Sequence, residues 1–149
     1  MKKILLYFTT IVMFFGVTSC GIKNDFDIGK LSNVKIDNNN NVTLSIKDNT
    51  LKKTAATLIL ENDSDKLLHY DEYYKMEIKK DKKWHKINVE LCFTDPLWEV
   101  KENSKKEIEL NWEHGYGKLA SGDYRIIKEV YFEGEEENAF NISAEFTIK

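Results

Sequence analysis

Arginine is almost absent from this sequence. Only one of its 22 basic residues, Arg125, is an arginine, so the side chain that best binds phosphates and carboxylates through paired hydrogen bonds is scarce. The 25 acidic residues outnumber the basic ones and give a formal charge of −3. A weakly acidic protein gains little from neutralising a phosphate backbone. We therefore expect no nucleic-acid partner.

The sequence also lacks the motifs of common catalytic and metal sites. Its histidines, His69, His85 and His114, are widely separated and have no metal-ligand spacing to one another or to Cys92. No nucleophile elbow or phosphate-binding loop occurs. The acidic run at residues 133–137 is more simply a solvated turn than a calcium site. We therefore expect no catalytic residue, no cofactor and no metal ion, and an enzyme is only the third alternative for function.

No apolar run is long enough to cross a membrane. Residues 4–15 are mostly apolar but are broken by Thr9 and Thr10, and they number twelve, whereas a membrane-spanning helix needs roughly twenty. This stretch follows the positive segment Met1-Lys2-Lys3 and has the length of the hydrophobic region of a secretory signal peptide. Residues 17–20 then read Val-Thr-Ser-Cys, which resembles the lipobox of bacterial lipoproteins: a branched aliphatic residue, two small residues and a cysteine that accepts lipid.

This resemblance implies a lipoprotein signal peptide at residues 1–19, cleavage in front of Cys20 and lipidation of Cys20. At about 0.8 kcal/mol per buried CH₂, two or more acyl chains on that cysteine would hold the protein on a membrane. The expected location is the cell membrane, facing outside the cytoplasm. An ordinary secretory signal that happens to end near a cysteine is the alternative.

Cleavage would leave Cys92 as the second cysteine of the mature chain. If Cys20 carries lipid, Cys92 has no intramolecular partner for a disulfide. Its position between Leu91 and Phe93 predicts a small buried side chain rather than a reactive thiol. Cleavage would also remove Lys2 and Lys3, so 20 basic and 25 acidic side chains would remain and the formal charge would be −5.

Residues 20–41 predict a flexible tether. They are polar and have no sustained hydrophobic period, and they end in a run of asparagines. Phe26, Ile28 and Leu31 are the side chains through which part of this segment could lie against the following domain.

After residue 41 the hydrophobic period changes to two, which is typical of antiparallel strands with one buried face. Residues 56–60 are apolar or β-branched on both faces and predict a strand in the middle of a sheet. The clearest alternating segments are residues 42–47, 74–79, 107–112 and 140–148. No window of ten residues has a convincing helical period. Residues 42–149 therefore predict one all-β domain, an immunoglobulin-like antiparallel β-sandwich of seven to eight strands, with a small Greek-key barrel as the alternative.

Two local features refine this prediction. Residues 80–83 predict a hairpin turn, and the lysines around it are the charges expected on an exposed edge strand. Residues 119–126 have the form L-x-x-G-x-Y-x-I, which is typical of a tyrosine corner. In such a corner the hydroxyl of Tyr124 would donate a hydrogen bond to a backbone group a few residues upstream.

With this segment included, residues 42–128 resemble a family of bacterial Ig-like domains found in secreted proteins and lipoproteins. The specific part is Trp112-x-x-x-Tyr116-Gly117-x-Leu119-x-x-Gly122-x-Tyr124-Arg125-Ile126-x-Lys128, and weaker matches are residues 60–66, residues 73–77 and Trp84. Many relatives have prolines before the glycine, where this chain has Ala120 and Ser121. The resemblance implies a sandwich outside the cytoplasm and supplies no catalytic residues.

The aromatic residues are the remaining candidates for binding. Trp84 and Trp112 have the inward parity of core residues in their strands, whereas Trp98 follows Asp95-Pro96-Leu97 in an expected loop and is the best candidate for an exposed ring. Residues 90–102, the longest stretch without alternation, therefore form the candidate binding loop. An exposed row of aromatic rings would favour sugars.

Taken together, these patterns predict a monomeric, membrane-anchored lipoprotein with a non-catalytic Ig-like interaction domain. Its expected partner is an envelope protein or a glycan. The alternative is a carbohydrate- or peptidoglycan-binding module.

Overall fold

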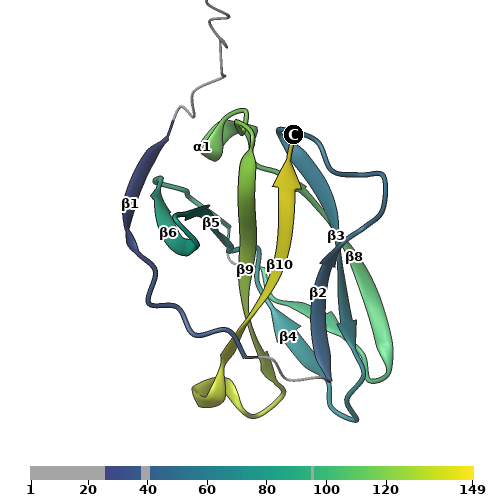
Figure 1. Cartoon of the computed structure of the whole chain (residues 1–149). Coiled ribbons are helices and arrows are strands. Elements are labelled where there is room, and N and C mark those ends of the chain that lie inside the picture. The colour runs from purple at the N-terminus through teal and green to yellow at the C-terminus, as the bar shows by residue number, and fades with distance from the viewer. Residues whose placement is uncertain (1–25, 38–40, 95) are drawn as a thin grey trace, which may run out of the picture.

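The computed structural model describes residues 26–37, 41–94 and 96–149. Over these residues the chain forms ten strands, one α-helical turn and one 3₁₀ turn (Figure 1). The strands are β1 (Asp27–Leu31), β2 (Val42–Ile46), β3 (Ala55–Asn62), β4 (Leu68–Tyr70), β5 (Lys75–Lys80), β6 (Lys83–Asn88), β7 (Trp98–Val100), β8 (Ser104–Asn111), β9 (Gly122–Phe132) and β10 (Phe140–Ile148). The helical turns are α1 (Glu113–Tyr116) and η1 (Glu136–Asn138).

The strands form two antiparallel sheets. In the smaller sheet β3 lies between β2 and β8, so the prediction of a central strand at residues 56–60 is confirmed. In the larger, seven-stranded sheet β10 pairs with one side of β9 along most of its length. The other side of β9 pairs first with β5, which continues to β6 and β1, and then with β4, which continues to β7. The larger sheet therefore divides into two branches on the side of β9 that does not pair with β10.

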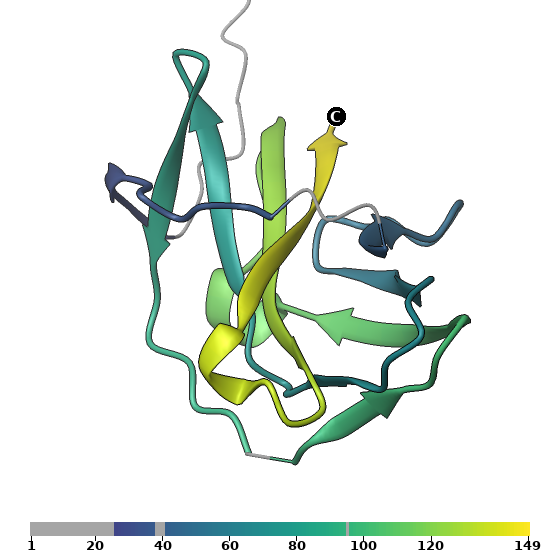
Figure 2. The ribbon, with the colours of Figure 1, turned by 90° about the horizontal axis from the view of Figure 1, so that it is seen from below.

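The two sheets face one another and enclose the core (Figure 2). β10 lies beside β2 and closes one side of the sandwich. The alternation along β3 and β10 places every second side chain in the core, where Leu58, Leu60 and Ile142 are almost completely buried. The all-β Ig-like sandwich expected from the sequence is confirmed, and the three-residue strands β4 and β7 raise the strand count over residues 42–149 to nine.

The tyrosine corner is present. Tyr124 is completely buried and its hydroxyl donates a hydrogen bond of 2.9 Å to the carbonyl of Ala120. The turn between β5 and β6 is also where the sequence placed it, with Asp81 and Lys82 at φ of 48° and 63°, as expected of a tight hairpin turn.

Of the two tryptophans that were expected in the core, only Trp112 lies there. Trp112 is buried, and its indole Nε1 donates a hydrogen bond of 3.0 Å to the carbonyl of Lys53. The prediction for Trp84 is wrong: its ring is half-buried on the outer face of the larger sheet, 4.7 Å from Cζ of Arg125. Arg125 is itself paired with buried Glu77, so the indole covers an ion pair rather than filling the core.

The expectation of a flexible tether over residues 20–41 is wrong for the part that the structure describes up to residue 37. β1 pairs with β6, and the following residues cross the outer face of the larger sheet. The backbone N–H of Ser32 donates to the carbonyl of Trp84 and that of Asp37 to the carbonyl of Asn141, each at 2.8 Å. The hydroxyl of Ser32 also donates to the carboxylate of Glu77. These contacts make the segment part of the domain.

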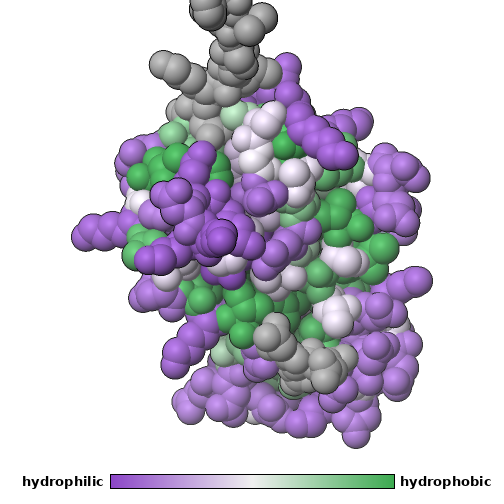
Figure 3. Space-filling view, in the orientation of Figure 1, coloured by the Kyte–Doolittle hydropathy of each residue, from purple (hydrophilic) through white to green (hydrophobic). Residues whose placement is uncertain are grey.

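The signal peptide, Cys20 and residues 21–25 lie outside the described residues. Within the part of the chain that is described, no helix has the length and apolar character needed to span a membrane. Figure 3 shows the face crossed by residues 32–37, where hydrophilic side chains project over the hairpin of β5 and β6 and hydrophobic surface is visible beside them.

Candidate binding groove at the branch of the larger sheet

The branch of the larger sheet borders a groove of about 510 Å³. β4 leaves β9 at the pair Tyr70–Val130, and β5 joins it at the pair Lys75–Ile127, so residues 71–74 form an unpaired crossing between the two strands. β8, an edge strand of the smaller sheet, forms the facing wall. We call this space the branch groove; among its lining residues are Tyr70, Tyr74, Phe93, Trp98, Lys106 and Lys128.

Lys128 holds the crossing segment in place. Its side chain is 1% exposed and has the inward parity of Ile126 on β9. The ammonium Nζ donates hydrogen bonds to the carbonyls of Asp71 (2.8 Å) and Tyr73 (3.0 Å). These carbonyls belong to the unpaired crossing, so the lysine supplies the donors that a neighbouring strand would otherwise provide.

The environment of Lys128 shifts its titration. Burial lowers the pKa of its ammonium to about 8, and the nearby Asp71 and Glu72 carboxylates oppose this shift. Nζ also lies 5.4 Å from the ring of Tyr70, within the range of a cation–π contact. The ammonium of this buried lysine makes its hydrogen bonds within the protein, and it holds the crossing segment at residues 71–74 in place.

Aromatic rings form the apolar part of the groove. Phe93 packs edge-on against Tyr73 and Tyr74, with ring centroids 5.3 and 5.4 Å apart. The ring centroid of Tyr74 lies 5.8 Å from that of Tyr116. Burial raises the pKa of the Tyr74 phenol to about 12 and that of Tyr116 further, so both are neutral hydrogen-bonding groups at physiological pH.

Trp98 lies at the mouth of the groove. It pairs with Tyr70 at the start of β7, an edge strand, and 42% of it is exposed. Nζ of Lys106 lies 5.0 Å from its ring, over one face. The neighbouring Leu97 is 55% exposed. The ring is therefore available to a ligand, with one face already in contact with a cation.

The structure brings part of the candidate loop together. Leu91, Cys92, Phe93 and Trp98 of residues 90–102 all line the branch groove. The prediction that Cys92 is buried is wrong, because Leu91 and Phe93 turn inward and leave Cys92 exposed between them. Lys128 was missed by sequence reasoning, although its parity with Tyr124 and Ile126 was a signal that it points inward.

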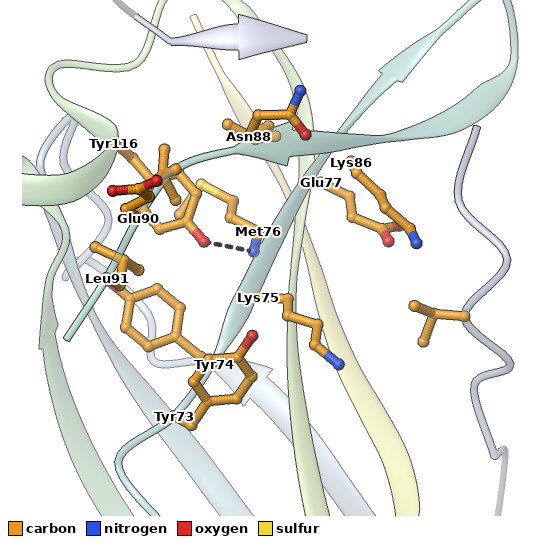
Figure 4. Close-up of a pocket in the computed structure, with 13 residues that line it drawn as sticks. Tyr73, Tyr74, Lys75, Met76, Glu77, Lys86, Asn88, Glu90, Leu91 and Tyr116 are labelled. Carbon is orange, nitrogen blue, oxygen red and sulfur yellow. Dashed lines mark hydrogen bonds between the residues drawn. The ribbon is translucent and has the colours of Figure 1, made fainter. Parts of the chain in front are cut away.

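A second cavity of about 660 Å³ adjoins the groove and shares Tyr74 and Leu91 with it (Figure 4). It opens where β5 and β6 diverge beyond the pair Glu77–Lys86. The backbone N–H of Met76 donates a hydrogen bond of 3.1 Å to the hydroxyl of Tyr116, drawn as a dashed line in Figure 4. This phenol satisfies a donor on β5 that β6 has left unpaired.

The histidines do not converge. His69 is buried and stacks on Tyr131 at 5.3 Å, His114 lines the branch groove and His85 lies on β6. No group of three or more histidines, cysteines or carboxylates that could hold a metal ion occurs among the described residues. The arrangement offers apolar contact and hydrogen bonding.

The fold defines a member of the Ig-like class of β-sandwich. A family model described as "Bacterial Ig-like domain" matches residues 38–147, and the chain belongs to that family. The comparison with curated proteins found no match. Among solved structures, the chain is similar to the self-complemented MyfA, the major subunit of Myf fimbriae from Yersinia enterocolitica, in complex with galactose. The two are 16% identical, the match covers 72% of this chain and 98% of that chain, and the TM-score is 0.38.

Proposed function

We propose that this protein is a membrane-anchored lipoprotein whose Ig-like domain binds a protein partner at the cell envelope without catalysing a reaction. The observation that carries the proposal is the half-exposed Trp98 at the mouth of a groove lined by aromatic rings. Exposed aromatic residues beside a desolvated pocket are typical anchors of protein interfaces. The Val-Thr-Ser-Cys motif at residues 17–20 supports anchoring through Cys20.

The distribution of exposed apolar side chains favours a protein over a glycan. Five large hydrophobic residues of the described chain are exposed, and three of them adjoin the groove: Tyr73, Leu97 and Trp98. They do not form a row of parallel rings, because Tyr73 is turned edge-on against Phe93 and Lys106 lies over one face of Trp98. A carbohydrate- or peptidoglycan-binding module is the second candidate, which the single exposed tryptophan keeps open.

A photo-crosslinking amino acid at position 98 of the full-length protein, expressed in cells, tests this function. We expect a discrete crosslinked protein from position 98 and none from Lys105, an exposed control position on β8. The purified Trp98→Ala variant should then bind the crosslinked protein at least about tenfold more weakly, the usual effect of removing an aromatic anchor. Its unfolding free energy should change by less than about 1 kcal/mol, since the ring is partly solvated.

Three results would contradict the proposal. Crosslinks of equal yield from positions 98 and 105 would show no specific interface, and unchanged affinity of Trp98→Ala would show that the groove is not the site. Binding of the wild-type protein to isolated peptidoglycan, lost in Trp98→Ala, would favour the glycan-binding alternative.

A further inference from the structure

The strands β5, β6 and β1 form an arm at one end of the larger sheet. Figure 2 shows them on the opposite side of the molecule from β2 and β3. β1 pairs only with β6 among the described strands, and its other edge is free. One face of the arm continues the core surface of β9, and β1 is the last described strand along it.

The strand register shows how apolar surface emerges on this face. Ile78 on β5 pairs with His85 on β6, and His85 pairs with Leu31 on β1. Exposure rises outward along this row, since Ile78 is completely buried, His85 is half-buried and Leu31 is 52% exposed. Ile28, which pairs with buried Ile87, is 38% exposed. Two large aliphatic side chains are thus partly exposed on one face of β1, because the register shift between Ile28 and Leu31 brings both onto that face.

Positive charge is concentrated at the tip of the same arm. Residues 79–86 contain five lysines and one aspartate, a formal charge of +4, whereas the rest of a chain beginning at Cys20 carries −9. Lys80 and Lys83 pair directly across the two strands and share the parity of Ile78 and His85, so they lie on the face that carries Leu31. Lys80, Lys82 and Lys83 are all exposed.

Protection of a sheet edge does not explain these lysines. β6 is not an edge, because β1 covers it, and the uncovered edge at β1 has only one lysine, Lys30. Like charges placed directly opposite one another also destabilise a hairpin, so the Lys80–Lys83 pair has a cost within the domain itself. An external anionic surface would offset that cost.

The position of the arm in the chain indicates which surface this is. Asp27, the first residue of β1, follows Cys20 by seven residues, and seven extended residues span at most about 25 Å. If Cys20 carries lipid, as the proposed function requires, β1 lies within that distance of the bilayer. We infer that the arm lies on an anionic lipid surface, with Ile28 and Leu31 at the boundary of the acyl chains and the hairpin lysines on the lipid headgroups.

The unacylated chain tests this inference without relying on the anchor. Residues 20–149 with Cys20→Ser keep every described residue, and their partition onto vesicles can be measured by sedimentation. We expect binding to vesicles with about one third phosphatidylglycerol, and little binding to pure phosphatidylcholine or at 0.5 M salt, where charges are screened. Each lysine near an anionic surface raises the partition coefficient about fivefold. Lys80→Glu with Lys83→Glu should therefore reduce the partition coefficient by about 25-fold or more.

Two further variants separate the arm from general charge effects. Lys52→Glu with Lys101→Glu makes the same change of charge at exposed positions elsewhere and should leave partition within about twofold of wild type. Leu31→Asn should weaken partition severalfold at unchanged charge. All variants should keep the wild-type unfolding midpoint, since the replaced side chains are exposed.

The inference is overturned if the unacylated chain does not bind anionic vesicles, or if both double variants weaken binding equally. Binding to a soluble polyanion but not to vesicles would also overturn it, because the aliphatic contacts would then have no role. The anchor is tested separately: vesicle binding by the unacylated chain together with an unmodified Cys20 in cells would refute the anchoring and leave the lipid-binding face standing.

Discussion

At the scale of single residues, Tyr124 closes the bend that leads into β9. Its hydroxyl donates to the carbonyl of Ala120 inside the core, where neither group reaches bulk water. We expect Tyr124→Phe to lower the unfolding free energy by about 0.5–1.5 kcal/mol, the usual net value of one internal hydrogen bond. Urea denaturation measures this, with Tyr131→Phe on the same strand as the control, because that residue is half-buried. An unchanged midpoint would show that the corner does not contribute to stability.

Lys128 predicts a distinct pH dependence of stability. The pKa of its ammonium is about 8 in the folded protein, against an ordinary value of 10.5. Between pH 8 and 10 the unfolded chain keeps a proton that the folded chain has lost, so this group makes the unfolding free energy rise with pH. Above pH 10 the rise is opposed, since Tyr74 and Tyr116 have raised pKa values in the folded protein and ionise first in the unfolded chain.

Denaturation of wild type and Lys128→Met from pH 7 to 10 tests this prediction. The wild type should gain up to about 2–3 kcal/mol relative to the variant over that range, at about 1.4 kcal/mol per unit of pKa shift. The variant cannot titrate and loses two hydrogen bonds to the crossing segment, so only the slopes of the two curves are compared. Parallel slopes would mean that Lys128 keeps an ordinary pKa in the folded protein.

The strand β1 and the following residues 32–37 are an integral part of the domain. They cover one edge of β6 and place the hydroxyl of Ser32 on Glu77, which is 1% exposed and accepts two hydrogen bonds from Arg125, at 2.8 and 2.6 Å. A chain that begins at residue 42 loses the strand pairing and one hydrogen bond to a buried charge. We expect it to be at least about 1.5 kcal/mol less stable than a chain that begins at residue 26, the usual value of a hydrogen bond to a charged group.

Ser32→Ala in the longer chain isolates the hydrogen bond from the strand pairing. The variant should show part of the stability loss that truncation causes, because β1 stays paired while the Glu77 carboxylate loses one donor. Equal unfolding midpoints for chains beginning at residues 26 and 42 would contradict the role given to β1.

The elements that the sequence predicted are those with a regular period. Alternation over residues 42–47, 107–112 and 140–148 marked β2, β8 and β10, because each buries one face against the opposite sheet. β1 was missed because Ile28 and Leu31 are isolated in a polar stretch and remain partly exposed even when the strand is paired. β4 and β7 have three residues each, too few to show a period, and they form because β9 extends beyond β5.

The branch groove was only partly predictable for a related reason. Trp98 was expected to be exposed because it follows a proline in a non-alternating stretch, and this exposure is confirmed. The wall opposite Trp98 comes from β8 and the crossing at residues 71–74, whose proximity depends on the branching of the larger sheet. No local pattern encodes that branching, so the sequence indicated one side of the groove and not its shape.

In the complete protein, the proposed anchor, the arm and the branch groove would fix how the domain is oriented on a membrane. β1, the first described strand, follows the proposed lipidation site at Cys20 by seven residues, whereas Trp98 is on β7, at the end of the other branch of the larger sheet. A domain that rests on the membrane through its arm would present the branch groove away from β1. The proposed anchor would therefore determine how the groove meets a partner.

The most direct measurement is the mass of the N-terminal peptide of the protein extracted from membranes of the cells that make it. We predict a mature chain that begins at Cys20 and carries diacylglycerol on its sulfur, and a Cys20→Ala variant that stays uncleaved and takes up no labelled palmitate. An unmodified cysteine, or normal processing and membrane retention of Cys20→Ala, would show that this Ig-like domain is not held on a membrane by lipid.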